Sequence, residues 1–137
     1  MEERIKEIKE ELNAFEDELL GYSFLVELSA YVPPDQPELM KDEYLQRGCQ
    51  SKVWIKYHMQ DKTFQMEATS DTMLIRGVLY VIMQLYNGLT PAQITERKID
   101  FLKECGIVRY FSGARTAGIG SITDSIYDYC CKASADI

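Results

Sequence analysis

The chain has 137 residues, of which 46% are hydrophobic and 27% charged, a composition typical of one soluble globular domain. Its longest apolar run, Val78–Met83, is too short to span a bilayer, and an acidic chain without a basic stripe is poorly suited to bind a phosphate backbone. We therefore expect a single domain over residues 1–137, with neither a membrane nor a nucleic acid as partner. The first residues show no apolar secretion signal, so we expect a cytoplasmic protein with reduced cysteines.

The net charge of −7 is concentrated in the first third of the chain. Residues 1–47 hold 13 acidic and 5 basic side chains, whereas residues 48–137 hold 9 acidic and 10 basic side chains. The simplest interpretation is a solvated helix face. The alternative is a surface that attracts a positively charged partner.

The first third of the chain predicts two helices followed by a loop. Apolar residues at positions 5, 8, 12, 15 and 19 have helical spacing and predict a helix over residues 3–20, stopped or kinked by Gly21. A second apolar stripe over residues 24–31 predicts a helix that ends before Pro33. Residues 33–41 hold three prolines and predict a loop.

The pattern then changes to that of a small antiparallel sheet. Apolar and polar residues alternate over residues 53–58 and 63–68, which predicts a hairpin joined at residues 60–62. We expect a third strand over residues 44–47.

Helices fill the rest of the chain. The segment 72–86 is apolar nearly all round and predicts a buried helix, started by Ser70 or Asp71. Gly77 lowers helix propensity by roughly 1 kcal/mol relative to alanine, so we expect another part of the chain to pack against its backbone. Pro91 suits the first turn of another helix, and further helices are expected over residues 96–105 and 119–131. The predicted class is α+β, a three-stranded antiparallel sheet packed against helices.

Cys49 is the residue with the clearest chemical potential. It follows Gly48 and directly precedes the first predicted strand. A cysteine on a loop at a strand edge can be presented to another protein, and glycine before it allows the backbone to turn. Taken alone, an isolated cysteine is more often a small core residue than a nucleophile.

Five segments, in their order and spacing, resemble the SufE family of sulfur-acceptor proteins. These segments are Gly48–Trp54, Ser70–Thr72, Ile75–Leu79, Tyr86–Pro91 and Phe111–Gly118. The resemblance implies a two-layer α+β fold, similar to that of the scaffold proteins of iron–sulfur cluster assembly. The chain departs from the family at Tyr110, Gly113 and Ala117, where a histidine, a proline and an amide residue are usual.

The resemblance also implies a function. Cys49 would receive sulfane sulfur, as a persulfide, from a cysteine desulfurase such as SufS or CsdA. The protein would raise the turnover of that enzyme and pass the sulfur to a cluster-assembly scaffold, as a sulfurtransferase-like carrier rather than an independent enzyme. We expect the desulfurase to be contacted by residues around the cysteine and one distant arginine, namely Gly48, Gln50, Ser51 and Arg115. Asp71 and Gly77 are expected to support the loop, and Asp71 also to cap the helix that follows.

The sequence predicts no metal and no organic cofactor. His58 is the single histidine, and the other cysteines, Cys105, Cys130 and Cys131, are not spaced to form a metal site with it. We expect these three cysteines to have no role in sulfur transfer.

Two other functions stay open, an iron–sulfur scaffold and a regulator that docks on a desulfurase without carrying sulfur. The first needs several thiolates that converge on a metal. The second needs Cys49 to be dispensable. If Cys49 is the carrier, we expect it to be sheltered in the free protein and reachable in the complex, because cellular thiols and oxidants attack an exposed persulfide. Gly48 would serve as the hinge of that loop.

Overall fold

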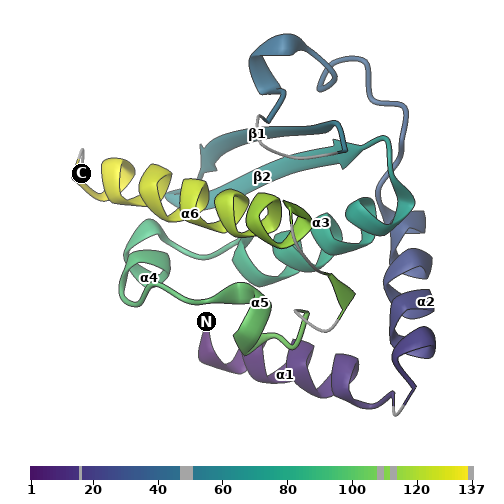
Figure 1. The fold of residues 1–137 in the computed structure, drawn as a ribbon. Helices are drawn as coiled ribbons and strands as arrows, with labels where there is room; N and C mark the ends of the chain where they lie inside the picture. Colours follow the sequence, from purple (N-terminus) through teal and green to yellow (C-terminus); the bar gives the residue numbers. More distant parts are fainter. Residues whose placement is uncertain (16, 47–50, 108–109, 112–113, 136–137) are drawn as a thin grey trace.

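The structure is a computed structural model that describes residues 1–15, 17–46, 51–107, 110–111 and 114–135. The side chains of residues 114–117 and 135 also lie outside this description. Figure 1 shows an antiparallel hairpin lying across two helices, α3 and α6, with α1 on the far side of α3 from the hairpin. This arrangement of helices packed on an antiparallel sheet confirms the predicted α+β class.

The hairpin consists of β1 (Val53–Gln60) and β2 (Thr63–Ser70). The two turn residues, Asp61 and Lys62, have φ of 52° and 66°, as type I′ turns require, and the flanking strands are in register from end to end. Alternate residues of both strands point into the core, including Ile55 and its partner Ala68. The predicted hairpin is therefore confirmed, with a two-residue turn.

The third strand predicted over residues 44–47 is wrong for the residues that the structure describes, which form two strands. A short 3-10 helix, η2 (Asp42–Tyr44), precedes β1. Leu45 then forms only an isolated bridge with Trp54, and the Gln46 amide donates to the Val53 carbonyl over 2.7 Å. The 3-10 turn leaves only two described residues alongside β1, too few for a strand.

The outer edge of β2 is covered by the turn that follows α3. The Asn87 side chain pairs with the Met66 backbone, because its Oδ1 accepts from the Met66 amide over 2.8 Å and its Nδ2 donates to the Met66 carbonyl over 3.2 Å. Phe64 exchanges backbone hydrogen bonds with Gly88 and Leu89, over 3.0 and 2.7 Å. Gly88 has a φ of 90°, which favours glycine. This turn therefore hydrogen-bonds backbone groups on the outer edge of β2, which would otherwise be free to pair with another strand.

The central helix is α3 (Met73–Tyr86), and ten of its residues are buried, as its apolar sequence predicts. The prediction that a neighbour packs closely on Gly77 is also confirmed. A Cβ built on Gly77 would lie 1.8 Å from the carbonyl oxygen of Leu25, which belongs to α2 (Glu18–Leu28). Glycine is therefore needed because the backbones of two helices meet there.

The first predicted helix is divided into two, and the break comes earlier than expected. α1 spans Glu2–Asn13, and α2 begins after Asp17, whose Oδ1 accepts from the Leu19 amide over 2.8 Å. Gly21 therefore lies inside α2 and does not end a helix. A Cβ at Gly21 would lie 1.9 Å from the hydroxyl of Tyr110, so this glycine makes room for a tyrosine from the other end of the chain.

The C-terminal half contains α4 (Pro91–Thr95), α5 (Phe101–Glu104) and α6 (Ala114–Ala135). The helix predicted over residues 96–105 is mostly wrong, because the side chain of Asp100 caps a helix of only four residues. The helix predicted over residues 119–131 is confirmed as part of α6. Within the described ranges, no helix has the length and apolar character needed to cross a lipid bilayer.

Candidate functional site

The structure describes the residues after the predicted cysteine loop but not the cysteine. Three predicted site residues lie outside the described residues, namely Gly48, Cys49 and Gln50. Arg115 lies in the first turn of α6, but its side chain is also outside the description. Ser51, Asp71 and Gly77 are described, and their contacts show what surrounds the downstream end of the loop.

Two residues after Cys49, the chain is fastened to the start of α3. The hydroxyls of Ser51 and Thr72 share a hydrogen bond of 2.7 Å. The Lys52 amide donates to Asp71 Oδ1 over 3.1 Å, and the Asp71 amide donates back to the Lys52 carbonyl over 3.2 Å. We refer to these four residues, Ser51, Lys52, Asp71 and Thr72, as the loop anchor.

Asp71 does not cap α3 as predicted. The N-cap residue is Thr72, and its side chain makes no capping hydrogen bond. The Asp71 carboxylate instead accepts hydrogen bonds from the Lys52 amide and from the Thr72 hydroxyl. Its short side chain satisfies an amide 19 positions away, a long-range partner for which the sequence carries no periodic signal.

Arg76 is a buried cation beside the loop anchor that the sequence analysis overlooked. Its Nη1 donates to the Ser70 carbonyl over 2.9 Å, and the Ser70 hydroxyl donates to the Lys52 carbonyl over 2.7 Å. Its Nε is buried and has no partner among the described residues. An arginine within an otherwise apolar helix was the signal that could have identified it, because a buried charge must be paired or hydrogen-bonded.

Gly77 contacts α2, and its expected support of the cysteine loop stays a prediction because residues 47–50 lie outside the described residues. The position that a side chain would occupy is filled by the Leu25 carbonyl. The packing of α2 on α3 is therefore enough to explain glycine there.

The other cysteines differ in accessibility. Cys105 and Cys130 are fully buried, whereas Cys131 is exposed. Burial raises the pKa of Cys105 to about 12, with a smaller contribution from the nearby Glu104 carboxylate. Burial likewise raises the pKa of Cys130 to about 12, helped by the neighbouring Cys131. At neutral pH both buried residues are thiols, which are far poorer nucleophiles than thiolates.

Within the described part of the chain, no group of three or more His, Cys, Asp or Glu side chains is arranged to hold a metal ion. His58 is half-buried on β1 and pairs across the hairpin with Gln65. The described residues thus offer no site that combines this histidine with cysteine ligands.

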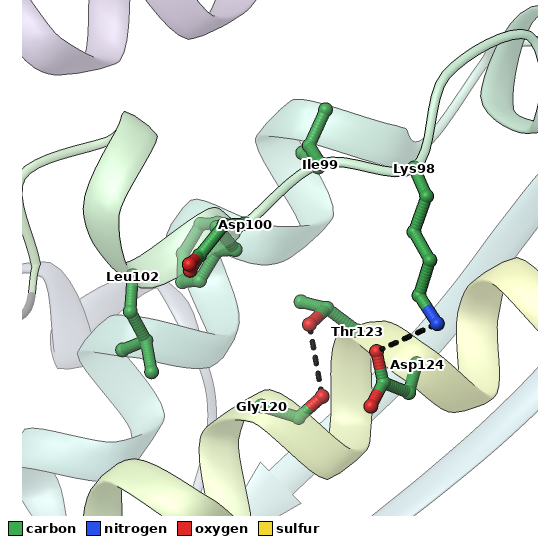
Figure 2. A pocket seen from close by; sticks show the side chains of 8 residues that line it. Lys98, Ile99, Asp100, Leu102, Gly120, Thr123 and Asp124 are labelled. Carbon is green, nitrogen blue, oxygen red and sulfur yellow. Dashed lines mark hydrogen bonds and ion pairs between the residues drawn. The ribbon is translucent and has the colours of Figure 1, made fainter.

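A cavity of about 370 Å³ lies between residues 98–102 and α6 (Figure 2). Lys98 and Asp124 both line it and form an ion pair, with Nζ and Oδ1 3.5 Å apart (Figure 2). Thr123 lines the same cavity and donates to the Gly120 carbonyl over 3.0 Å. The lining includes neither cysteine nor histidine, so this cavity does not supply a sulfur nucleophile.

Comparisons with known proteins agree on one family. The SufE family, described as an Fe–S metabolism associated domain, matches residues 6–130. An uncharacterized SufE-like protein of Rhizobium meliloti is 26% identical over 107 residues, which cover 74% of this chain and 76% of that protein. An uncharacterized SufE-like protein of Synechocystis sp. is 32% identical over 76 residues, which cover 56% of this chain and 48% of that protein.

A solved structure shares the fold over nearly the whole chain. The solution structure of a hypothetical protein from Thermus thermophilus superposes with a TM-score of 0.75 and covers 96% of both chains. Its sequence is only 18% identical, so the likeness concerns the fold alone.

Proposed function

The chain belongs to the SufE family of Fe–S metabolism associated domains, and on this premise we propose that it is a sulfur carrier that uses Cys49. In this proposal Cys49 accepts sulfane sulfur from a cysteine desulfurase, stimulates the turnover of that enzyme and delivers the sulfur to iron–sulfur cluster assembly. The observation that carries the proposal is the family match over residues 6–130, which contains the cysteine segment Gly48–Trp54.

The loop anchor supports this assignment. A carrier cysteine must reach into another enzyme, yet the rest of the domain must stay folded while it does so. Ser51 and Lys52 are hydrogen-bonded to Thr72 and Asp71, immediately before β1 begins. A movement of the cysteine segment would therefore end at the anchor and would leave the hairpin in place.

The proposed transfer is a thiol exchange without net redox change. The Cys49 thiolate attacks the outer sulfur of the desulfurase persulfide, and a new sulfur–sulfur bond forms on Cys49. The old sulfur–sulfur bond breaks at the same time, and the desulfurase cysteine leaves as a thiolate that takes up a proton. Attack by an acceptor thiolate on the outer sulfur of the Cys49 persulfide then releases the sulfur in the same way.

Burial argues against two of the other three cysteines as the sulfur carrier. Cys105 and Cys130 are buried and protonated at neutral pH, so neither fits the carrier role. Cys131 is exposed, which makes it the rival that an experiment must exclude.

The test is intact mass spectrometry after incubation with a cysteine desulfurase and cysteine. We expect the unmodified chain and the Cys131→Ser variant each to gain sulfur, and the Cys49→Ser variant to gain none and to lose stimulation of the desulfurase. Serine keeps the size of cysteine but cannot form a persulfide. Full stimulation by Cys49→Ser would refute the carrier role and favour the regulator.

We also propose that Arg115 contacts the desulfurase, as the family resemblance implies. Interface arginines often contribute strongly to binding. Arg115→Ala should raise the concentration needed for half-maximal stimulation without lowering the melting temperature. An unchanged half-maximal concentration, or a large drop in melting temperature, would refute this role.

A further inference from the structure

A groove of about 260 Å³ opens where α1 meets α3 and the end of α2. Part of its lining also lines a smaller cavity that reaches inward to Leu12 and Phe24. In Figure 1 α1 lies on the far side of α3 from the hairpin, and α2 runs along one side of the molecule. We call it the tyrosine groove and define it by Glu7, Ile8, Glu11, Leu28, Tyr31 and Tyr80.

The groove presents aromatic and apolar surface to solvent. The rings of Tyr31 and Tyr80 stack with centroids 4.9 Å apart, and Tyr31 is 67% exposed. Leu20 is 57% exposed and lies on the same side of α2 as Leu28, two turns away. Leu19 and Tyr22 of α2 are also exposed, and exposed apolar side chains gathered on one helix indicate a surface that another molecule covers.

The α1 wall of the groove is acidic. Glu3, Glu7 and Glu11 follow one another at four-residue spacing, so they form one row of like charges along the helix. None of the three forms an ion pair with a residue in the described part of the chain. Arg4 also lines the groove, but its Nη1 points to the end of α3, where it donates to the carbonyls of Leu85 and Asn87 over 3.2 and 2.8 Å, and it forms no ion pair with these carboxylates among the described residues.

We propose that the tyrosine groove binds a basic amphipathic segment of a partner protein. Arginine or lysine side chains of that segment lie over the tyrosine rings and against Glu7 and Glu11, and its apolar side chains cover Ile8 and Leu28. A basic segment is proposed because its positive charge complements the carboxylates of Glu7 and Glu11. The row of carboxylates repels nucleic acid and anionic lipid surfaces, and the described residues offer no metal site there.

This docking surface goes beyond the persulfide chemistry and does not depend on Cys49. Its residues come from the first 31 positions and from the middle of α3, whereas the loop anchor joins the residues just before β1 to those just before α3. A partner segment seated in the groove would therefore add a second point of attachment, separate from the anchor.

The probe is a fluorescein-labelled helical peptide of about 18 residues, with leucines on one face and two arginines one turn apart beside them. A peptide in which both arginines are glutamates serves as control. We expect saturable binding of the basic peptide by fluorescence anisotropy, weakened by salt, and backbone amide shifts in NMR spectra that cluster on α1, α3 and η1 (Ser29–Tyr31). The acidic peptide should not bind.

Two double variants with the same change in net charge distinguish binding at the tyrosine groove from general attraction of a basic peptide to an acidic protein. The Glu7→Lys/Glu11→Lys variant should weaken binding by at least about tenfold, since two attractive contacts become repulsive. Glu10→Lys/Glu96→Lys makes the same change in net charge with two exposed glutamates outside the groove, and it should weaken binding less than about threefold. Tyr31→Leu keeps apolar area but removes a ring face, and it should weaken binding about threefold.

Equal losses in the two double variants would overturn the proposal, because the attraction would then be non-specific. Absence of saturable binding up to about 1 mM, or amide shifts that cluster away from the groove, would also overturn it. The unmodified chain and the Cys49→Ser variant should bind the peptide equally, so failure of the carrier function would leave this result unchanged.

Discussion

At the scale of single residues, Asp71 binds the chain close to Cys49. Its carboxylate accepts from the Lys52 amide over 3.1 Å, three positions after the cysteine. Replacement by alanine removes this acceptor and leaves the exposed Lys52 amide to water, so the loop anchor loses a hydrogen bond that holds it to the start of α3. If the loop shelters Cys49, we expect Asp71→Ala to raise the alkylation rate of Cys49 several-fold in the free protein.

The measurement is the rate of alkylation in a Cys131→Ser background. Only Cys131 has to be replaced, because Cys105 and Cys130 are buried. Asp35→Ala is the matched control, since Asp35 is an exposed aspartate of the proline-rich loop. Equal rates in the two variants would show that Asp71 does not govern access to the thiol.

The two buried thiols predict a loss of stability in alkali. Burial raises the pKa of Cys105 and of Cys130 to about 12, whereas a thiol in the unfolded chain has a pKa of about 8.5. Their contribution to stability is therefore fully present below about pH 8.5. Above it the unfolded state binds fewer protons than the folded state, and the free energy of unfolding falls as pH rises toward 12.

We expect each buried thiol to lower the free energy of unfolding by on the order of 1 to 2 kcal/mol between pH 8 and pH 10. Urea unfolding at pH 8, 9 and 10 measures this dependence. Cys105→Ala/Cys130→Ala should show a shallower decline than the unmodified chain, and Cys131→Ala should show the same decline. Alanine is preferred to serine at the two buried positions, because a buried hydroxyl needs a partner. Parallel declines in all three proteins would refute the prediction.

At the level of helices, two glycines make a matched pair. Gly77 in α3 and Gly120 in α6 both lie inside helices, where glycine costs roughly 0.5–1 kcal/mol relative to alanine. A Cβ at Gly77 would lie 1.8 Å from the Leu25 carbonyl oxygen, whereas a Cβ at Gly120 would meet nothing within 4 Å. The same substitution should therefore have opposite effects at the two positions.

Gly77→Ala should lower the free energy of unfolding by about 2 to 3 kcal/mol, because α2 and α3 must move apart to admit the methyl group. Gly120→Ala should raise it by about 0.5 to 1 kcal/mol. Thermal unfolding followed by circular dichroism measures both changes. A Gly77→Ala protein as stable as the unmodified chain would contradict the close approach of the two helices.

For the whole molecule, we predict that the purified protein carries no stoichiometric metal. The described residues bring no three His, Cys, Asp or Glu side chains together at one point, and an iron–sulfur scaffold needs several converging thiolates. Elemental analysis of protein purified without chelators should therefore find well under one zinc or iron per chain. Close to one metal ion per chain would favour the scaffold function instead.

The sequence by itself determined the features that depend on neighbouring residues. Alternation over residues 53–58 and 63–68 identified the hairpin, and the apolar run over residues 72–86 identified the buried helix. Both patterns can be recognised from consecutive residues alone. The segments around Cys49 identified the SufE family, which the comparison over residues 6–130 confirmed. Local patterns of this kind need no knowledge of what packs against them.

Only the tertiary structure decided the features that join distant residues. Asn87 pairs with Met66 and covers the outer edge of β2, and Tyr110 fills the space that Gly21 leaves open. Asp71 reaches the Lys52 amide instead of capping α3. Each of these partners lies about 20 or more positions away, so no period along the chain encodes the contact. These contacts form because buried backbone groups must find hydrogen-bond partners and the interior must be closely packed, and both requirements are met only when the chain is folded.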